Sequence, residues 1–332
     1  MKKEWLVKTL VLGIILLLVY MNITPSYAVD NVKNSSKPIF NGNILYVGGS
    51  GEGNYTKIQD AVDNASDGNM VFVYDDSSPY YENIIINKSI SLIGEDKNTT
   101  IIDGNRTGGT ICIDELVFGV TINGFTVREG TFAGIYINAT FCIIENNIIS
   151  SNSCGVFLDG NYCRDNVVKN NNILNNTAGI KIEYGSNNDI LYNHISNNLY
   201  CGVSIAFTSN YNNVSHNHIL NSKFGIELIS RVDGPIIRRV LPANNITSND
   251  ISFNTIGIGI YGLIENHIKK NNFIFNDENA YFMLNTKNIW IGNYWNRTRF
   301  LPYPIFGMTF FFPWINFDWY PAKKPYNILE RG

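Results

Sequence analysis

A short unit of alternating apolar residues, headed by glycine or alanine, recurs through the middle of the chain. It starts as Gly134-Ile135-Tyr136-Ile137 and returns at steps of 21, 24, 23, 23, 32 and 23 residues. A fixed period of this length indicates stacked repeats, in which each unit buries its apolar face only against its neighbours. The pattern predicts one elongated domain. The heads of the units are Gly134, Gly155, Gly179, Gly202, Gly225, Gly257 and Ala280.

Each period also contains an Asn two residues before an apolar residue, as in Asn171 and Ile173, with another apolar residue five positions before that one. These are short strand patterns, and no run is long enough for an amphipathic helix. One turn of a parallel β-helix needs two or three strands in about 20 to 25 residues, whereas a propeller blade needs about 40. The period therefore favours a parallel β-helix.

Equivalent positions in such a coil lie one strand spacing apart, so the Asn residues are expected to form inward ladders of hydrogen-bonded amides. The repeated glycines are interpreted as corner residues, whose backbone conformation other side chains resist. The first predicted polar column is Asn146, Asn171, Asn193, Asn217, Asn249 and Asn271. The second is Ser151, Asn176, Asn198, Ser222, Asn254 and Asn276.

Both ends of a coil need covering, because open sheet edges pair with other chains. Residues 55–65 place Ile58, Ala61 and Val62 on one helical face, which predicts an N-terminal helical cap. Asn293 to Pro321 is rich in aromatic residues, and we favour a C-terminal cap over an aromatic ligand-binding or membrane-touching surface. The long step of 32 residues contains an insertion at Arg231 to Ala243, which is expected to project from the stack.

The N-terminus indicates export. Met1 to Ala28 has lysines at its start, an apolar run and a small-x-small end, as in a cleaved signal peptide; an uncleaved membrane anchor is the alternative.

The net charge is -3, which together with the lack of a basic patch argues against nucleic-acid binding. The predicted organisation is a signal peptide at 1–28, a linker at 29–45, the β-helix at 46–292 and a capping segment at 293–332.

The five cysteines cannot all pair within one chain. Cys154 and Cys201 are placed two turns apart, about 10 Å, which is too far for a disulfide. We expect buried thiols that pack as small apolar residues. Several Asn-x-Ser/Thr sequons, such as those at Asn98 and Asn175, are possible glycosylation sites in an exported chain.

Three stretches together resemble one known family. They are YTKIQDAVDNASDGNMVFVYDDSSPYYENIIINKSISLIGED, the repeated N-x-[IV] and G-I-x-[IL] steps, and the Asn293-Tyr294-Trp295 motif. They are similar to the NosD-like proteins of the pectate-lyase-like superfamily, which are exported archaeal and bacterial surface proteins. The resemblance implies an all-β, single-stranded right-handed parallel β-helix. It leaves activity open, because a fold does not fix a function.

The register suggests one candidate metal site. The outward column next to the first ladder is predicted as Asn147, Asn172, His194, His218, Asp250 and Asn272, with His216 beside His218. His194, His216 and His218, with Asp250 as a fourth ligand, could bind Cu or Zn, since imidazole is the commonest protein ligand for these metals. The alternative is that these side chains simply cover a solvated face.

Catalysis needs paired carboxylates or a carboxylate close to Lys or Arg. Lys181 and Glu227 are placed two turns apart with Ser204 between them, so these charges are interpreted as solvated surface. The segment YYENIIINKSISLIGED is similar to the opening of pectin methylesterases, but their Asp-Phe-Ile-Phe-Gly motif is absent from the chain. The combined Asp-Asp, His-Gly and Arg-x-Lys steps of polygalacturonases are absent too.

We therefore expect an extracytoplasmic, monomeric binding or scaffold protein. Its expected partner is a cell-surface polysaccharide or a surface-layer protein, with no integral membrane span once the signal is removed. Two alternatives stay open: a copper- or zinc-handling protein that uses the histidine patch, and a polysaccharide lyase or hydrolase with unrecognised catalytic residues.

Overall fold

A computed structural model of the chain describes residues 42–230, 243–262, 265–284, 287–309 and 311–328. The chain divides into Met1–Lys37 and Pro38–Gly332, and all described residues belong to the second unit. The predicted signal peptide, most of the linker, and the insertion apart from Ala243 lie outside the described residues. Among the residues that are described, no helix is long and apolar enough to cross a membrane.

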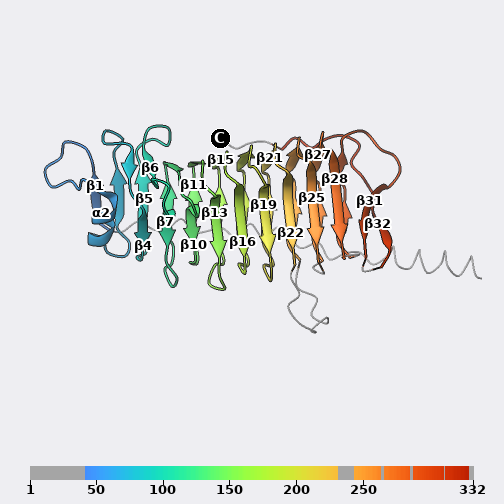
Figure 1. Ribbon diagram of the computed structural model, residues 1–332, viewed down its shortest axis with the longest axis horizontal. Coiled ribbons are helices and arrows are strands. Elements are labelled where there is room, and N and C mark those ends of the chain that lie inside the picture. The colour runs from blue at the N-terminus through green and yellow to red at the C-terminus, as the bar shows by residue number, and fades with distance from the viewer. Residues whose placement is uncertain (1–41, 231–242, 263–264, 285–286, 310, 329–332) are drawn as a thin grey trace, which may run out of the picture. The chain divides into compact units, whose positions relative to one another are not determined.

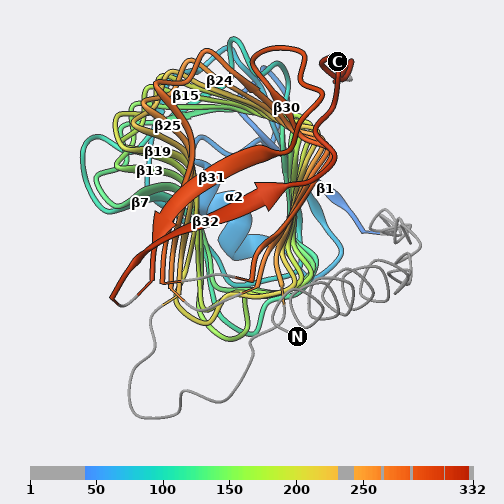
Figure 2. The ribbon, with the colours of Figure 1, turned by 90° about the vertical axis from the view of Figure 1, so that its right-hand side faces the viewer.

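The described chain winds into a coil with three parallel sheets, and each turn adds one strand to each sheet (Figures 1 and 2). The prediction of a single-stranded, right-handed parallel β-helix is confirmed. Sheet A consists of β1 (Ile44–Val47), β2 (Met70–Val73), β5 (Ser91–Gly94), β8 (Thr121–Asn123), β11 (Ile143–Glu145), β14 (Val167–Lys169), β17 (Asp189–Leu191), β20 (Asn213–Ser215), β23 (Asn245–Thr247), β26 (His267–Lys269) and β29 (Ile289–Ile291). Sheet B consists of β3 (Tyr80–Tyr81), β6 (Ile101–Asp103), β9 (Thr126–Arg128), β12 (Ile148–Ser150), β15 (Asn172–Leu174), β18 (His194–Ser196), β21 (His218–Leu220), β24 (Asp250–Ser252), β27 (Asn272–Ile274) and β30 (Tyr294–Trp295). Sheet C consists of β4 (Ile84–Ile86), β7 (Gly109–Ile113), β10 (Ala133–Ile137), β13 (Cys154–Asp159), β16 (Ala178–Glu183), β19 (Cys201–Ala206), β22 (Phe224–Ile229), β25 (Ile256–Tyr261), β28 (Glu278–Met283), β31 (Tyr303–Met308) and β32 (Pro313–Asp318).

The core is built from columns of aliphatic side chains. Ile173 pairs with Ile195, which pairs with Ile219 on the next turn, and all three are fully buried. Burying one such side chain stabilises the fold by about 1.5–3 kcal/mol relative to leaving it exposed. Because the same position is apolar on each turn, the strands cannot slip by one residue without exposing a whole column.

The predicted asparagine ladders are present, and their geometry repeats from turn to turn. A residue with positive φ, such as Asn170 (φ 55°), turns the chain, and the next residue, Asn171, points inward. The Asn171 Nδ2 atom donates to the Ile144 carbonyl at 2.8 Å and to the Asn193 Oδ1 atom at 3.1 Å. The amides therefore satisfy the corner backbone and link successive turns, as buried polar groups must.

In one turn the predicted register was wrong by one residue. The ladder members there are Asn147 and Asn152, which are buried, whereas Asn146 and Ser151 are exposed corner residues with positive φ. A third ladder, which was not predicted from the sequence, lies at the corner between sheets C and A. Its members are Asn166, Asn188, Asn212, Asn244, Asn266 and Asn288.

The repeated glycines have a different role from the predicted one. Their backbones are not left-handed; the constraint is the closeness of the next turn. A Cβ on Gly225 would lie 2.6 Å from the Gly257 carbonyl oxygen and 2.7 Å from Ile251 Cγ2. Both distances are shorter than a Cβ atom keeps from its non-bonded neighbours. In the turn after Gly257, Asn279 rather than Ala280 takes the position of the glycine.

Caps cover both ends of the coil. At the first, α2 (Ile58–Asn64) buries Ile58, Ala61 and Val62 in the core, as predicted. At the other, β31 pairs with β28 in parallel and with β32 in an antiparallel hairpin that lies across the end of the coil (Figure 2). Trp295 is fully buried and stacks on Phe273 at 4.6 Å and on Tyr303 at 4.0 Å between ring centroids.

One ladder ends on a carboxylate from this cap. In the ladder between sheets A and B, each amide donates one hydrogen bond to the next member toward the C-terminal end of the coil, so the last member, Asn293, needs another acceptor. The buried Asp318 supplies it: Oδ2 accepts from Asn293 N at 2.8 Å, from Asn293 Nδ2 at 3.1 Å and from Trp295 Nε1 at 3.1 Å. Oδ1 accepts from Gly292 N at 3.0 Å. Charge-assisted bonds of this kind are stronger than neutral ones.

All five cysteines are free; four are buried, as predicted, whereas Cys112 is partly exposed. Cys154 and Cys201 occupy one column with Ala178 between them. Burial raises the pKa of the Cys142 and Cys154 thiols to about 12, which keeps them protonated at neutral pH.

Candidate functional site

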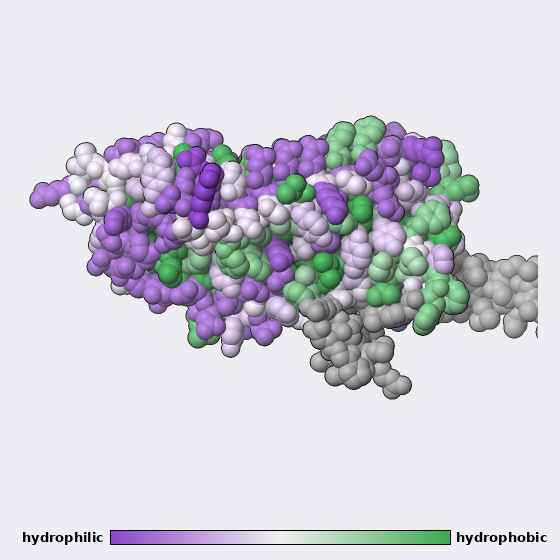
Figure 3. All heavy atoms as spheres, in the orientation of Figure 1, coloured by the Kyte–Doolittle hydropathy of each residue, from purple (hydrophilic) through white to green (hydrophobic). Residues whose placement is uncertain are grey.

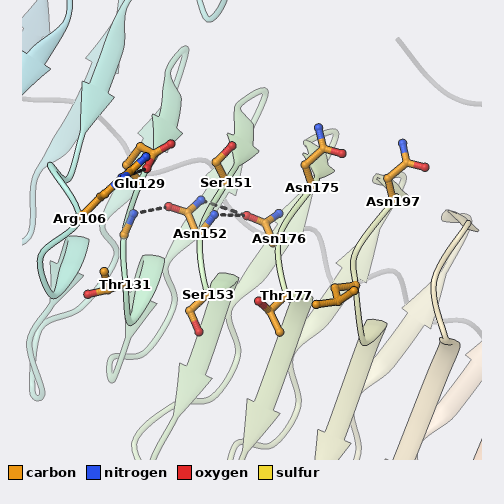
Figure 4. Close-up of a pocket in the computed structure, with 12 residues that line it drawn as sticks. Arg106, Glu129, Thr131, Ser151, Asn152, Ser153, Asn175, Asn176, Thr177 and Asn197 are labelled. Carbon is orange, nitrogen blue, oxygen red and sulfur yellow. Dashed lines mark hydrogen bonds and ion pairs between the residues drawn. The ribbon is translucent and has the colours of Figure 1, made fainter.

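A groove of about 660 Å³ follows the corner between sheets B and C over successive turns (Figure 4). Each turn contributes a corner residue with positive φ and a residue two positions later, which lies just before the sheet C strand. Gly130 and the inward ladder members Asn152 and Asn176 complete its floor. The outer lining residues are Arg106, Glu129, Thr131, Ser151, Ser153, Asn175, Thr177, Asn197 and Leu199.

The floor of the groove is fixed, whereas its rim offers unused polar groups. The Asn152 amide donates to Asn176 Oδ1 at 3.1 Å and accepts from Gly130 N at 2.8 Å. Asn175 and Asn197 point away from this ladder (Figure 4), and within the described part of the chain their side chains make no hydrogen bond. Side-chain amides offer both donors and acceptors, so the rim suits a ligand rich in hydroxyl groups.

Aromatic side chains border this groove on the outer face of sheet C. Phe132, which follows the groove residue Thr131, is exposed and packs against Phe157 at 5.6 Å between ring centroids. Tyr136 packs against Phe157 at 5.7 Å. On a later turn Tyr200 follows the groove residue Leu199. Exposed rings of this kind combine a flat apolar surface with polar edges.

The charges on sheet C are less solvated than the sequence indicates. Ser204 does separate Lys181 from Glu227, as predicted. Glu227, however, is only 4% exposed, and its Oε1 atom accepts a hydrogen bond of 2.8 Å from the Tyr200 hydroxyl. Burial raises the pKa of Glu227, and it raises the pKa of Tyr200 to about 12. Lys181 is paired with Glu183 at 2.7 Å.

The predicted outward column is present on sheet B with one correction. Asn172, His194, His218, Asp250 and Asn272 pair in register on five successive turns, and Ile148 rather than Asn147 precedes them. The His194 and His218 rings stack at 6.4 Å between centroids. His216 is not on their strand: it turns the corner with φ 58° and stacks on Tyr192 at 4.9 Å.

The end of the described chain contacts part of this column, at Asn272 and His218. Residues 322–328, called the C-terminal strap below, run back along sheet B (Figure 1). Tyr326 exchanges two hydrogen bonds of 2.9 Å with Asn272, and His218 Nε2 lies 3.2 Å from the Ile328 carbonyl oxygen. Burial raises the pKa of Asp250, whereas the nearby charge of His218 lowers it.

The family described as "Periplasmic copper-binding protein (NosD)" matches residues 62–238, more than half of the chain. The chain belongs to the NosD family. The resemblance inferred from the sequence is therefore confirmed.

This NosD-family chain is also similar to individual proteins. It is 31% identical over 299 residues to a "Cell surface glycoprotein" of Methanothermus fervidus, covering 72% of this chain and 46% of that protein. It is 36% identical over 97 residues to a probable pectinesterase/pectinesterase inhibitor 6 of Arabidopsis thaliana, covering 26% of this chain and 18% of that protein. The chain thus spans about half of the length of the first relative and under a fifth of the second.

Solved structures with similar chains include pectate lyase Pel9A and a mannuronan C-5 epimerase module. The first has 14% identity and a TM-score of 0.47, covering 75% of this chain and 77% of that chain. The second, AlgE4 of Azotobacter vinelandii, has 15% identity and a TM-score of 0.45, covering 71% of this chain and 85% of that chain.

The family description raises the question of whether these residues fit copper. Within the described ranges, no group of three or more His, Cys, Asp or Glu side chains is arranged to hold a metal ion. The His194 and His218 rings stack in the outward column of sheet B, and Asp250 pairs with His218 on the next turn. The third predicted histidine, His216, lies at the corner instead. The described residues therefore do not present a preformed copper site.

Neither the groove nor the strap was predicted from the sequence. On some turns the groove is signalled by a polar residue two positions after the corner, as in Ser153 and Thr177, and this signal becomes visible only once the corner register is known. The strap has no such signal, because its main contacts with Asn272 and His218 use backbone atoms.

Proposed function

We propose that this chain is an extracytoplasmic binding protein, and that the groove between sheets B and C holds a segment of a neutral cell-surface polysaccharide. The single observation that carries the proposal is the groove rim, where unused amide and hydroxyl groups repeat at the spacing of the turns. A polymer with repeating hydroxyl groups can meet several turns at once, so weak contacts add up along it.

Three further observations support this function. Exposed aromatic rings border the groove and offer flat surfaces to the apolar faces of sugar rings. Arg106, at one end of the groove, is paired with Glu129 at 3.1 Å, so no unbalanced charge calls for an acidic ligand. The family description places its members in the periplasm, and the relative from Methanothermus fervidus is named a cell surface glycoprotein.

The test is calorimetric titration with neutral polysaccharides, such as mannan and soluble glucans, and with polygalacturonate as an acidic comparison. The double variant Asn175→Gly and Asn197→Gly removes two rim amides and keeps a residue that tolerates positive φ. We expect it to weaken binding about tenfold, because each lost hydrogen bond is worth about 0.5–1.5 kcal/mol. Asn221→Gly is the matched control, since Asn221 turns the same corner (φ 54°) beyond the groove.

A second matched pair tests the rim hydroxyls. Thr177 lines the groove and Thr255 occupies the same position of a later turn outside it. Thr177→Ala is expected to reduce affinity and Thr255→Ala to leave it unchanged. Equal affinities in both pairs would exclude the groove as the binding site. The same incubations, assayed for new reducing ends and unsaturated products, test the lyase or hydrolase alternative.

Metal binding by His194, His218 and Asp250 is the second candidate, supported by the family description and by the shared column of these residues. Copper or zinc would be titrated into the protein and into the double variant His194→Ala and His218→Ala. Because His267 lies on sheet A, His267→Ala is the control. Binding that survives the double variant excludes this site, and His216→Ala then tests the remaining predicted ligand.

A further inference from the structure

The outer face of the β31–β32 hairpin is an apolar surface that no described part of the chain covers. The two strands pair so that Phe306 lies opposite Ile315 and Met308 opposite Pro313 on the face that points away from the coil. Phe306 is 58% exposed. The inner face, by contrast, carries the buried Ile305, Asn316 and Asp318. The outer face of the hairpin is therefore apolar and exposed, and the one charged side chain of the hairpin, Asp318, lies on the buried inner face.

Side chains around the hairpin extend this surface. Phe311 and Phe312, between the two strands, are 83% and 69% exposed. Figure 3 shows apolar side chains gathered at the end of the molecule that holds β31 and β32. Soluble monomers seldom expose large apolar patches, and those that exist usually mark a binding surface. The other exposed large apolar residues of this segment are Phe300, Leu301, Met308, Trp314, Phe317, Trp319 and Tyr320.

The exposed charges that residues 293–328 themselves contribute have one sign. Residues 293–328 contain four basic side chains, Arg297, Arg299, Lys323 and Lys324, and a single acidic one, Asp318. Asp318 is fully buried and occupied by the ladder, so within residues 293–328 only positive charge faces water. The whole chain has a net charge of -3, so this segment is basic within an otherwise acidic chain.

We propose that the hairpin and the basic residues beside it form a docking surface for an anionic lipid bilayer, called the aromatic end below. Aromatic side chains settle at the level of lipid headgroups, and flanking Lys and Arg are attracted by anionic lipids. A second copy of the chain is the less suitable occupant. A two-fold contact would set the same basic residues of both copies against each other.

This geometry leaves the groove accessible. The aromatic end lies at the last turn of the coil, whereas the groove is lined by residues of earlier turns, from Arg106 to Leu199. A coil bound through its end would thus hold the groove away from the bilayer. The proposal is independent of the ligand assigned to the groove.

The test uses the full chain with Trp5→Phe, so that Trp314 and Trp319 are the tryptophans outside the core. Their fluorescence is measured with vesicles that contain brominated lipid, either with phosphatidylglycerol or with phosphatidylcholine alone. We expect quenching with the anionic vesicles and several-fold less with the neutral ones. High salt should reduce it, because the attraction of each lysine is screened.

Two double variants decide the position of contact. Phe311→Asn with Phe312→Asn removes two exposed phenylalanine rings between the strands and should raise the lipid concentration for half-quenching about tenfold or more. Phe253→Asn with Phe275→Asn is the matched control, since both are exposed rings in mutual contact elsewhere on the coil. Because every variant keeps the apolar run of the N-terminus, its contribution to vesicle binding is common to all.

The role of the basic residues is tested with Lys323→Gln and Lys324→Gln in one variant. This variant should bind anionic vesicles more weakly, by roughly fivefold per lysine. Circular dichroism confirms that each variant is folded. Absence of quenching, or equal lipid dependence for the two phenylalanine variants, overturns the proposal. A concentration-dependent dimer that Phe311→Asn with Phe312→Asn abolishes also overturns it, because the occupant is then a second copy.

Discussion

Asparagine has two distinct roles in this coil, and adjacent residues show both. Asn175 turns the corner with positive φ and faces the groove, whereas Asn176 points inward and bonds to the next turn. The repeated spacing was enough to predict the ladders. It could not choose between Asn146 and Asn147, because both are asparagine and only the corner geometry separates them.

The ladder predicts a large cost for losing one inward amide. Asn193 donates to the Val168 carbonyl and to Asn217, and its Oδ1 atom accepts from Asn171 N and Nδ2. Asn193→Ala leaves several of these buried groups unsatisfied and should lower the free energy of unfolding by about 3 kcal/mol. Asn197→Ala, at an exposed corner, should cost about 1 kcal/mol. Denaturant unfolding measures both, and equal costs would contradict the structural role of the ladder.

The buried Glu227 predicts a pH dependence of opposite sign to that of a salt-bridged carboxylate. Its pKa in the folded protein is raised above the ordinary value of 4.5, because burial disfavours the charged form. The folded state therefore holds the proton longer than the unfolded state, and stability falls as the pH rises above 4.5.

Glu227→Gln should remove this loss while keeping an acceptor for the Tyr200 hydroxyl. We expect the variant to match the original protein near pH 4 and to be more stable at pH 7, as measured by thermal unfolding across that range. Stability curves that stay parallel would show that Glu227 titrates alike in both states.

At the scale of elements, the C-terminal strap restricts access to the histidine column at His218. Periodicity correctly placed His194, His218 and Asp250 in one column, because parallel in-register strands repeat side-chain positions. It could not foresee the strap, which joins Tyr326 to Asn272 across 54 positions without any repeat. Nor could it place His216, since a positive φ at a histidine has no sequence signature.

Ending the chain after Ala322 is expected to uncover this column. His218 should then react faster with diethyl pyrocarbonate, while His267 on sheet A keeps its rate and serves as the internal reference. The loss of the Tyr326 hydrogen bonds should lower stability by about 1–3 kcal/mol. An unchanged His218 rate, followed by mass spectrometry, would show that the strap does not shield it.

For the whole molecule, stability arises from repetition rather than from covalent links. The coil type followed from the period alone, because each turn meets only its neighbours. The hairpin closure was predicted only as an aromatic cap, since its pairing occurs once and has no second copy to reveal the register.

The free thiols give a test at this scale. Cys142, Cys154, Cys163 and Cys201 are buried, whereas Cys112 is partly accessible. In the folded protein we expect Cys112 to react first with a thiol reagent and the other four to react only on unfolding. Titration with and without urea measures this, and a melting temperature that depends on reductant would instead point to a disulfide.

The ladder has a distinct last turn, because its amides donate toward the C-terminal end and Asp318 accepts from the final one. An added copy of one turn would insert between existing turns and meet the same donors and acceptors on both sides, so gene duplication can lengthen such a protein without redesign. The closing carboxylate is different, because only the last turn has donors left over. Lineages of this fold should therefore vary in the number of turns much more readily than in the segment that ends them.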